Sequence, residues 1–538
     1  MKKSIITVAL LVWGACALAQ NLNPTVEVTN TYIREASGIE KPVLLLQMPD
    51  SVQRFNLDFD YAVRNTPYQG AYEFKPYLVQ LRPMPRPSDE GTFYLNAGMG
   101  YRAHPELTLI WTPVKTEKFR LNLFADHYSY LGQYRKLRAN TDAHLVEDTG
   151  ERYNGKAMHT DAGANAVLGW SGGVLTADLR YRNIFGEDHG GICTNNLFQG
   201  QARLKSSPDA KFSYEVGTRV SALEMGDLGE FHTVSDASVN FRVGGIHHFG
   251  LTAGMESVGR DGDNAFDVAL TPRYVLTAGR FLLNLGVKFS YIFASEHSTY
   301  KTKSDFVFPA VNVSFEAIPG ALVLQAWATG GDKLNVYSRM VDANPFLYNF
   351  HAPGTGYDNS TERVNVGLGA RGSIAGRFSY DVKAGYAYWK NALVWGYVAD
   401  AYPAAFAYAD PYHLFYVDVK AAWKNEFLEV DGNLTYKYTT LSMDTFFAPP
   451  ALSGKLKAVY NWGNRIRAGV TLSGKTARES QTVVCPAFLD LGVLADFQMT
   501  RKLGLWVKSG NLLNQEVSDI PFHSEAGPWF TLGLRLHF

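Results

Sequence analysis

The sequence lacks the features that mark nucleic-acid-binding proteins and helical membrane proteins. Lys and Arg together number 51, as do Asp and Glu, so the formal net charge is zero. A balanced charge gives no electrostatic reason to expect nucleic acid or an acidic partner. Beyond residue 19 the chain has no apolar run of about 18 residues, the length that a membrane-spanning helix requires. The composition therefore excludes a basic nucleic-acid-binding protein and a bundle of membrane helices.

Cysteine is scarce, with three residues in 538. Cys16 lies in the N-terminal leader, which leaves Cys193 and Cys485. Two cysteines cannot build the disulfide framework that stabilises small secreted domains. A single disulfide between these two is one candidate, and two free thiols are the alternative.

We also assign no catalytic or metal-binding motif in the sequence to a functional site. No nucleophile elbow, zinc-binding H-E-x-x-H, P-loop or dinucleotide fingerprint stands out as a site. The stretch 260–264, Arg-Asp-Gly-Asp-Asn, has the start of a calcium loop but lacks the bidentate Glu farther along. We therefore expect no cofactor, no metal and no catalytic residue, and an enzyme built on loop residues is kept only as the third alternative below.

Residues 1–19 have the pattern of a secretory signal peptide. Lys2 and Lys3 precede the apolar run 4–18, and residues 17–19 form an A-x-A cleavage site before Gln20. We expect the protein to be exported and the leader, with Cys16, to be removed.

Residues 20–90 differ from the rest of the chain because they are rich in proline, with the run Pro-Met-Pro-Arg-Pro at 83–87. Such spacing favours extended backbone with few ladder hydrogen bonds. We predict a segment that either fills a lumen or lies in the periplasm. The expected organisation is a signal peptide at 1–19, this segment at 20–90, and one large β-domain at 91–538.

From Thr92 onward, apolar and polar residues alternate with a period of two. In 281–291, Phe, Leu and Val residues share one face, while Asn284, Gly286, Lys288 and Ser290 share the other. The same pattern holds in 212–220 and 428–437. Alternation places the two sets on opposite faces of a strand. The charged residues that we expect to face a lumen and to be candidates for solute contact are Glu215, Arg219, Lys288, Asp431 and Lys437. Because both signs are present, no strong ion selectivity is expected.

The connections between these segments alternate in length. Ten short turns are predicted, at 113–118, 170–173, 206–210, 244–245, 277–280, 319–320, 375–376, 424–425, 461–464 and 500–502; longer polar loops are predicted at 131–158, 331–360, 388–411 and 510–527. With a first strand near 92–101 and a last strand at 529–538, this gives an all-β, transmembrane antiparallel β-barrel of about 22 strands. The turns would be periplasmic and the loops extracellular. A secreted β-sandwich or propeller also alternates, but charges facing its packed core would be costly.

Aromatic residues gather near the strand ends, as the two interfaces of a membrane require. Trp170 and Trp462 mark one end, and Tyr130 and Tyr386 the other. This pattern favours the barrel over the sandwich.

The chain resembles the barrel of TonB-dependent receptors of the Bacteroidetes. Val-Lys-Ser-Gly-Asn-Leu-Leu-Asn at 507–514 is similar to the N-L-F-N hairpin of that family, and 93–111 is similar to the first hairpin of a plugless subset. Residues 20–90 are too few for the family's plug domain. In the stretch 24–29, Thr25, Val26 and Val28 are similar to the short motif that binds TonB, with an ordinary extended segment as the alternative.

The last strand carries Phe530, Leu532, Leu534, Leu536 and Phe538 on one face. The resemblance implies that a terminal aromatic strand of this kind is the insertion signal read by the outer-membrane assembly machinery.

These observations predict an integral protein of a Gram-negative outer membrane, in contact with its lipid. The leading function is a porin-like channel or transporter for an unidentified solute, with TonB or a surface lipoprotein as partner. The alternative is a non-transporting accessory subunit of a larger complex with other outer-membrane proteins. The third alternative, a barrel enzyme, has no assigned residues.

Overall fold

The computed structural model describes residues 92–538 except 189–190, 208–210, 261–262, 297, 302, 348–357, 399–401 and 440–446. The chain divides into two units, residues 1–67 and 68–538, and every described residue belongs to the second. The predictions for the signal peptide, for the segment 20–90 and for a TonB contact at Thr25, Val26 and Val28 lie outside the described residues.

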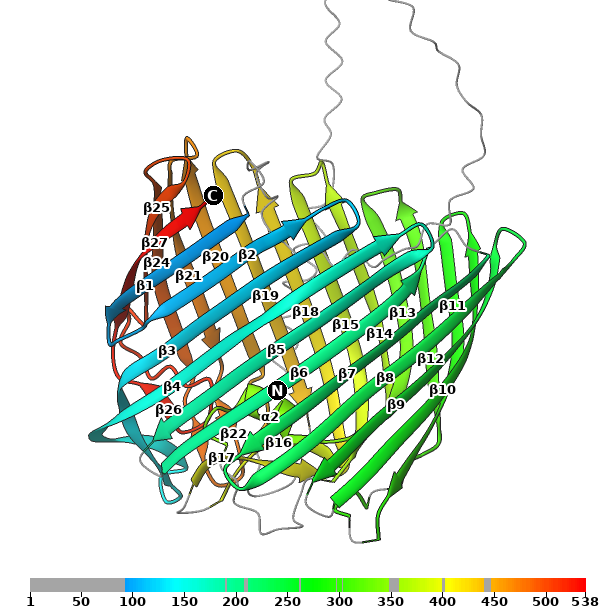
Figure 1. The fold of residues 1–538 in the computed structure, drawn as a ribbon. Coiled ribbons are helices and arrows are strands. Elements are labelled where there is room, and N and C mark those ends of the chain that lie inside the picture. The colour runs from blue at the N-terminus through cyan, green and yellow to red at the C-terminus, as the bar shows by residue number, and fades with distance from the viewer. Residues whose placement is uncertain are drawn as a thin grey trace, which may run out of the picture. The chain divides into compact units, whose positions relative to one another are not determined.

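The described residues form a closed antiparallel sheet of 22 strands (Figure 1). Its first eleven strands are β1 (Phe93–Tyr101), β2 (Glu106–Lys115), β3 (Phe119–Asn140), β4 (Leu145–Trp170), β5 (Gly173–Asp188), β6 (Gly191–Ser206), β7 (Phe212–Met225), β8 (Leu228–Val243), β9 (His247–Arg260), β10 (Asp263–Ala278) and β11 (Phe281–Ala294). The others are β12 (Val307–Ile318), β13 (Leu322–Lys333), β14 (Ser360–Ile374), β15 (Phe378–Lys390), β18 (Tyr412–Lys424), β19 (Leu428–Thr439), β20 (Leu452–Trp462), β21 (Ile466–Lys475), β24 (Phe488–Gln498), β25 (Leu503–Gly510) and β27 (Trp529–His537). The predicted barrel and its strand number are confirmed.

The ring closes between the first and the last strand. In the β1–β27 register, Tyr101 faces Phe530 and Leu95 faces Leu536. The terminal residue takes part, because Phe93 and Phe538 exchange two backbone hydrogen bonds of 3.0 and 2.9 Å. A closed ring leaves no sheet edge with unpaired backbone groups.

The two ends of the barrel differ as predicted. All ten short turns join consecutive strands of the ring at one end, which is the upper end in Figure 1. The other end carries α2 (Tyr337–Ala343), β16 (Ala392–Val398), β17 (Tyr402–Ala409), β22 (Arg478–Glu479), β23 (Val484–Cys485) and β26 (His523–Glu525). No helix of the described residues is long and apolar enough to cross a membrane.

The predicted loop at 131–158 is wrong. β3 and β4 continue as a paired hairpin to Asn140 and Leu145, so only a few residues form the connection. The cross-strand pairs that carry the charges of this stretch explain the error, because Arg138 pairs with Glu147 at 2.6 Å and Lys136 with Glu151 at 2.6 Å. The polar residues of this stretch therefore belong to an extension of the two strands.

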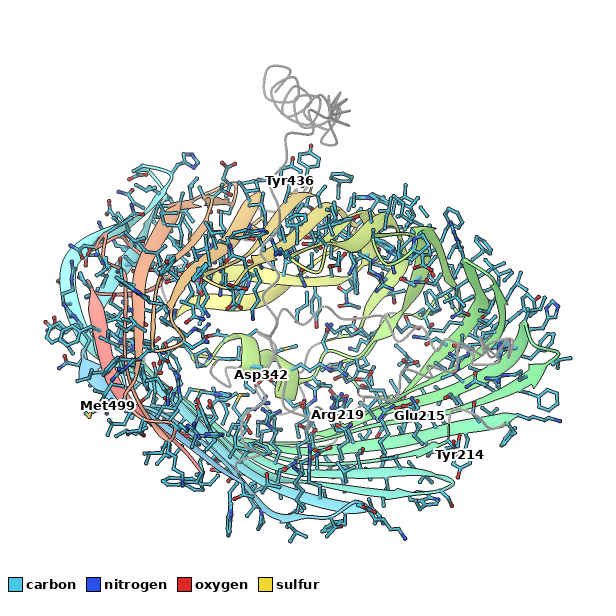
Figure 2. All side chains as sticks on the ribbon, turned by 90° about the horizontal axis from the view of Figure 1, so that it is seen from above. Tyr214, Glu215, Arg219, Asp342, Tyr436 and Met499 are labelled. Atoms are coloured by element: carbon cyan, nitrogen blue, oxygen red, sulfur yellow. The ribbon has the colours of Figure 1, made fainter. Side chains whose placement is uncertain are left out.

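The outer face of the ring is apolar and the inner face polar. Tyr214 and Tyr436 point away from the barrel, while Glu215 and Arg219 point inward (Figure 2). Phe530, Leu532 and Leu534 are 52%, 59% and 50% exposed on the outer face. A continuous exposed apolar surface suits hydrocarbon rather than water. Trp462, 70% exposed, lies at the turn end as the girdle predicts, whereas Tyr130 is only 1% exposed and packs inside against Tyr134.

Candidate lumen site

The five charged residues proposed for the lumen wall do not form one site. Glu215 and Arg219 lie on β7, Lys288 on β11, and Asp431 and Lys437 on β19. Glu215 is held by Arg203 and lies 3.7 Å from the ammonium of Lys205. Because Tyr436 points outward, Asp431 and Lys437 are on the inner face of β19. The wall is therefore charged on several sides, and each residue has its own cross-strand surroundings.

A segment between β13 and β14 enters the ring. This segment, residues 334–347 and called the roof segment below, contains α2, and Asp342 of α2 lies within the outline of the barrel in Figure 2. Its apolar side chains Tyr337, Met340 and Val341 pack against Ile184, Leu197 and Leu223 of β5–β7. The segment starts at β13 and reaches strands far around the ring, so it crosses the lumen at the loop end.

Buried charges fasten the roof segment to the wall. Both oxygens of the Glu230 carboxylate, on β8, accept backbone N–H groups at the start of α2, from Tyr337 and Ser338, each at 2.9 Å. The Arg260 guanidinium lies 3.8 Å from the same carboxylate and stacks over the rings of Tyr300 and Tyr337. Glu230 and Arg260 are almost fully buried. A buried carboxylate is tolerated only when paired and hydrogen-bonded, as here.

Two further ion pairs hold the other side of α2. Arg339 donates to Glu256 of β9 at 2.6 Å, and His232 of β8 approaches the same oxygen at 2.9 Å. Asp342 accepts a hydrogen bond from Arg182 of β5. No single sequence signal marks these partners, because they are separated by 80 residues or more along the chain.

The loop that precedes the last strand forms a second inward element. In residues 511–528, called the β26 loop, β26 pairs with β3, and His523 lies 3.0 Å from the carboxylate of Asp188. The ring of Phe346, from the roof segment, stacks on His523 with centroids 4.0 Å apart. The two inward elements therefore support each other.

Burial raises the pKa of Glu525 in the β26 loop to about 7, and the carboxylates of Asp490 and Asp519 act in the same direction. Because the folded loop retains a proton that the unfolded chain releases above pH 4.5, stability of the loop falls as pH rises from about 4.5 to about 7. Amide exchange in residues 511–528 is expected to be faster at pH 8 than at pH 5 after correction for intrinsic rates. Glu525→Gln is expected to reduce this difference but not to remove it, because burial also raises the pKa of Glu516 in the same loop to about 7. An equal difference in the variant would contradict this assignment.

Of the two alternatives for the cysteines, the structure has the second, because Cys193 and Cys485 are both free thiols and form no disulfide. They belong to different apolar clusters. Cys193, on β6, packs under α2 and donates to the carbonyl of Leu347, whereas Cys485, on β23, packs with Val146 and Phe447.

Both thiols are expected to resist alkylation in the folded protein. Cys193 and Cys485 are 5% and 2% exposed, and burial raises the pKa of Cys485 to about 11, so little thiolate forms. Maleimide labelling followed by mass spectrometry should give two additions in denaturant and essentially none in mild detergent. Rapid labelling of Cys193 in the folded protein would show that the roof segment is not packed as described.

Three stretches match the sequence patterns of catalytic or nucleotide-binding motifs. They are Gly-Trp-Ser-Gly-Gly at 169–173, Gly-Leu-Gly-Ala-Arg-Gly at 367–372, and Gly-Val-Thr-Leu-Ser-Gly-Lys-Thr at 469–476. The first is the turn between β4 and β5, the second lies in β14, and the third runs along β21. Each motif functions only at a strand-to-helix turn, which none of these has. Glycine at 367 is explained by packing, because a Cβ there would lie only 2.2 Å from the ring of Trp327.

A groove of about 620 Å³ lies on the outer face of β18–β21 and β24. Gly432, Gly454 and Gly474 lie on three successive strands in it, and the other outward lining residues are mostly Leu, Val and Phe. It opens toward the surroundings of the barrel and not toward the lumen. Within the described residues no group of three or more His, Cys, Asp or Glu side chains is arranged to hold a metal ion.

Comparison with known proteins gives a clear likeness in fold and none in sequence. No protein-family model and no curated protein matches the chain. The FrpB iron transporter of Neisseria meningitidis has a TM-score of 0.64 at 10% identity, covering 84% of this chain and 81% of its own. The siderophore receptor PiuA of Acinetobacter baumannii has a TM-score of 0.60 at 8% identity, with coverage of 84% and 82%.

A ferric enterobactin receptor of Pseudomonas aeruginosa, PfeA, gives a TM-score of 0.59 at 11% identity, covering 83% of this chain and 80% of its own. These neighbours are named as receptors and transporters and not as enzymes. At such low identity the likeness establishes the fold: the chain is a 22-strand antiparallel barrel of the kind that these receptors and transporters have.

Proposed function

We propose that the protein is an integral outer-membrane barrel, similar to TonB-dependent receptors, that passes a solute through its lumen. The observation that carries the proposal is the combination of a 22-strand ring, a charged inner wall, and a roof segment fastened across one end by side-chain contacts. A transporter needs a polar path and an element that can move out of it. The apolar outer face supports contact with membrane lipid.

Planar-bilayer recording tests this function. Purified protein should conduct, and removing residues 20–85, the proposed lumen-filling segment, should raise the conductance. Absence of current from both forms would contradict the transport function. The resemblance to TonB-dependent receptors implies TonB as the energising partner, and a mutation of Val26 and Val28 to Asp should then abolish capture by the periplasmic domain of TonB.

An accessory role in a larger outer-membrane complex is the second candidate. The observation that favours it is the extent of buried contact around the roof segment, since Glu230 and Arg260 would have to be exposed for the lumen to open. Stable co-purification with a surface lipoprotein or another barrel in mild detergent, together with absence of current, would support this role over transport.

A further inference from the structure

We propose that the inner wall formed by β18, β19 and β20 binds anions, and that the solute carried through the barrel is therefore anionic. This inference rests on the proposed function for its transport part, but the binding surface itself can be tested without conduction.

Three exposed lysines surround one amide on this wall. In the strand registers, Lys420 of β18 lies opposite Asn433 of β19, and Asn433 lies opposite Lys455 of β20. Residues directly opposite each other share a face of the sheet, and Asn433 is on the inner face because Tyr436 of the same strand points outward. Lys457 follows two residues after Lys455 on that face. The strand spacing of about 4.8 Å brings the three side chains within reach of one multivalent anion.

Two of these lysines have a carboxylate directly opposite in the strand registers, Asp381 for Lys420 and Asp431 for Lys457. Among the described residues, no carboxylate lies within 4.0 Å of the ammonium groups of Lys420, Lys437, Lys455 or Lys457. Glu429 pairs instead with Arg467 at 3.2 Å, and Asp381 of β15 pairs with Lys383 at 3.3 Å. The inner face of β18–β20 thus carries five lysines, Lys424 included, and three carboxylates, Asp418, Glu429 and Asp431.

On the opposite wall several arginines have carboxylate partners, while Arg219 of β7, also on the inner face, is in no ion pair of the described residues. There Arg180 pairs with Asp161, and Arg203 pairs with Glu215 and with Asp236 at 3.1 Å. β7, with Glu215, and β19, with Tyr436, lie on opposite sides of the ring (Figure 2). An overall balance of charge can therefore conceal a local excess of positive charge on β18–β20, and the proposal replaces the expectation of no strong ion selectivity with an anion preference that the experiment below tests.

Lysine suits a surface over which an anion passes. Its ammonium is a hydrated point charge on a flexible stem, and it binds phosphate, sulfate or carboxylate without the fixed bidentate geometry of arginine. Conduction requires several sites that attract the ion but release it again, and pores for anions use Lys and Arg in this way. The exposed lysines of β18 and β20 meet that requirement.

The test compares the wild-type protein with the variant Lys420→Glu/Lys455→Glu/Lys457→Glu. A control variant, Lys118→Glu/Lys211→Glu/Arg377→Glu, changes the net charge equally at exposed residues of the short turns. Binding of inorganic tripolyphosphate to the full chain in detergent is measured by calorimetry at low salt. The wall variant should bind about tenfold more weakly than the wild type, and the control variant should bind like the wild type. Equal binding by wall variant and wild type overturns the inference.

Reversal potentials in a KCl gradient then separate this inference from the transport function. The wild type should favour chloride, the wall variant should favour potassium, and the control should behave like the wild type. Current without a change of selectivity in the wall variant would contradict the anionic solute while leaving transport intact. Absence of current together with lysine-dependent tripolyphosphate binding would contradict transport while upholding the anion-binding wall. A retained heat-modifiable band on gels shows that each variant is folded.

Discussion

Glu230→Ala is expected to release the roof segment from the barrel wall. The substitution removes the acceptor of two backbone N–H groups at the start of α2 and leaves the Arg260 guanidinium buried beside a single remaining carboxylate, Asp263, at 3.6 Å. Removing one partner of a buried ion pair typically costs about 3–5 kcal/mol. Since most of the contacts of Glu230 are with the roof segment and its neighbours, that cost should appear as local opening and not as loss of the ring.

Two measurements should detect the opening. Limited proteolysis should cleave within 334–347 in the variant and not in the wild type, and conductance should rise if the segment obstructs the lumen. Glu147→Ala is the matched control, because Glu147 pairs with Arg138 in the exposed β3–β4 hairpin, where an ion pair contributes little. Unchanged proteolysis and conductance in Glu230→Ala would show that the buried carboxylate does not hold the segment.

Gly533→Leu is expected to prevent closure of the ring. Gly98 of β1 and Gly533 of β27 leave room on the inner face for the indole of Trp506 on β25, and a Cβ on Gly533 would lie 2.2 Å from that ring and 2.5 Å from the carbonyl oxygen of Ala97. The side chain of Trp506 could move aside for the new residue. The carbonyl of Ala97 could not, because it belongs to the backbone of β1 at the seam. Overpacking of this kind typically costs about 1–3 kcal/mol, and more where backbone must move.

Among the junctions of the 22-strand ring, the β1–β27 seam joins the strands that are farthest apart in sequence, so we expect the loss to appear in insertion. We expect most of the Gly533→Leu protein to lack the compact, heat-modifiable band that folded barrels show on gels. Gly200→Leu is the control, since a Cβ there meets its nearest atom at 3.6 Å, on the outer face. Removal of Phe538, which bonds Phe93 across the same seam, should also slow insertion. Normal folding of Gly533→Leu would refute the tight seam.

The barrel itself was predictable because its rules are local. Lipid outside the barrel and water inside it require apolar and polar residues to alternate along every strand. Each short turn is marked by Gly, Pro or Asn within a few residues. That is why the ten turns and the strand number agree with the structure. The error at 131–158 has the same origin: where both faces of a hairpin are polar, alternation vanishes and a strand cannot be distinguished from a loop.

The glycine motifs show that a match in sequence pattern does not by itself establish a binding site. Gly-x-Gly-x-x-Gly at 367–372 has the spacing of a dinucleotide fingerprint, but a period of two on a strand places Gly367 and Gly369 on the same face, beneath Trp327. In this barrel the glycines of the motif therefore make room for a neighbouring side chain. Only the surrounding elements, strand against strand with no helix, distinguish the two meanings.

The sequence alone determined the all-β barrel, the number of its strands, its two unlike ends and the apolar face of the terminal strand, since all of these follow from periodicity within short windows. Only the tertiary structure decided what lies inside. Glu230 and Tyr337 are 107 residues apart, Phe346 stacks on His523, Cys193 and Cys485 are buried in separate clusters, and Lys420, Lys455 and Lys457 share one open wall. Such contacts depend on which loops turn inward and which strands the closed ring makes neighbours, and no local pattern of residues encodes either.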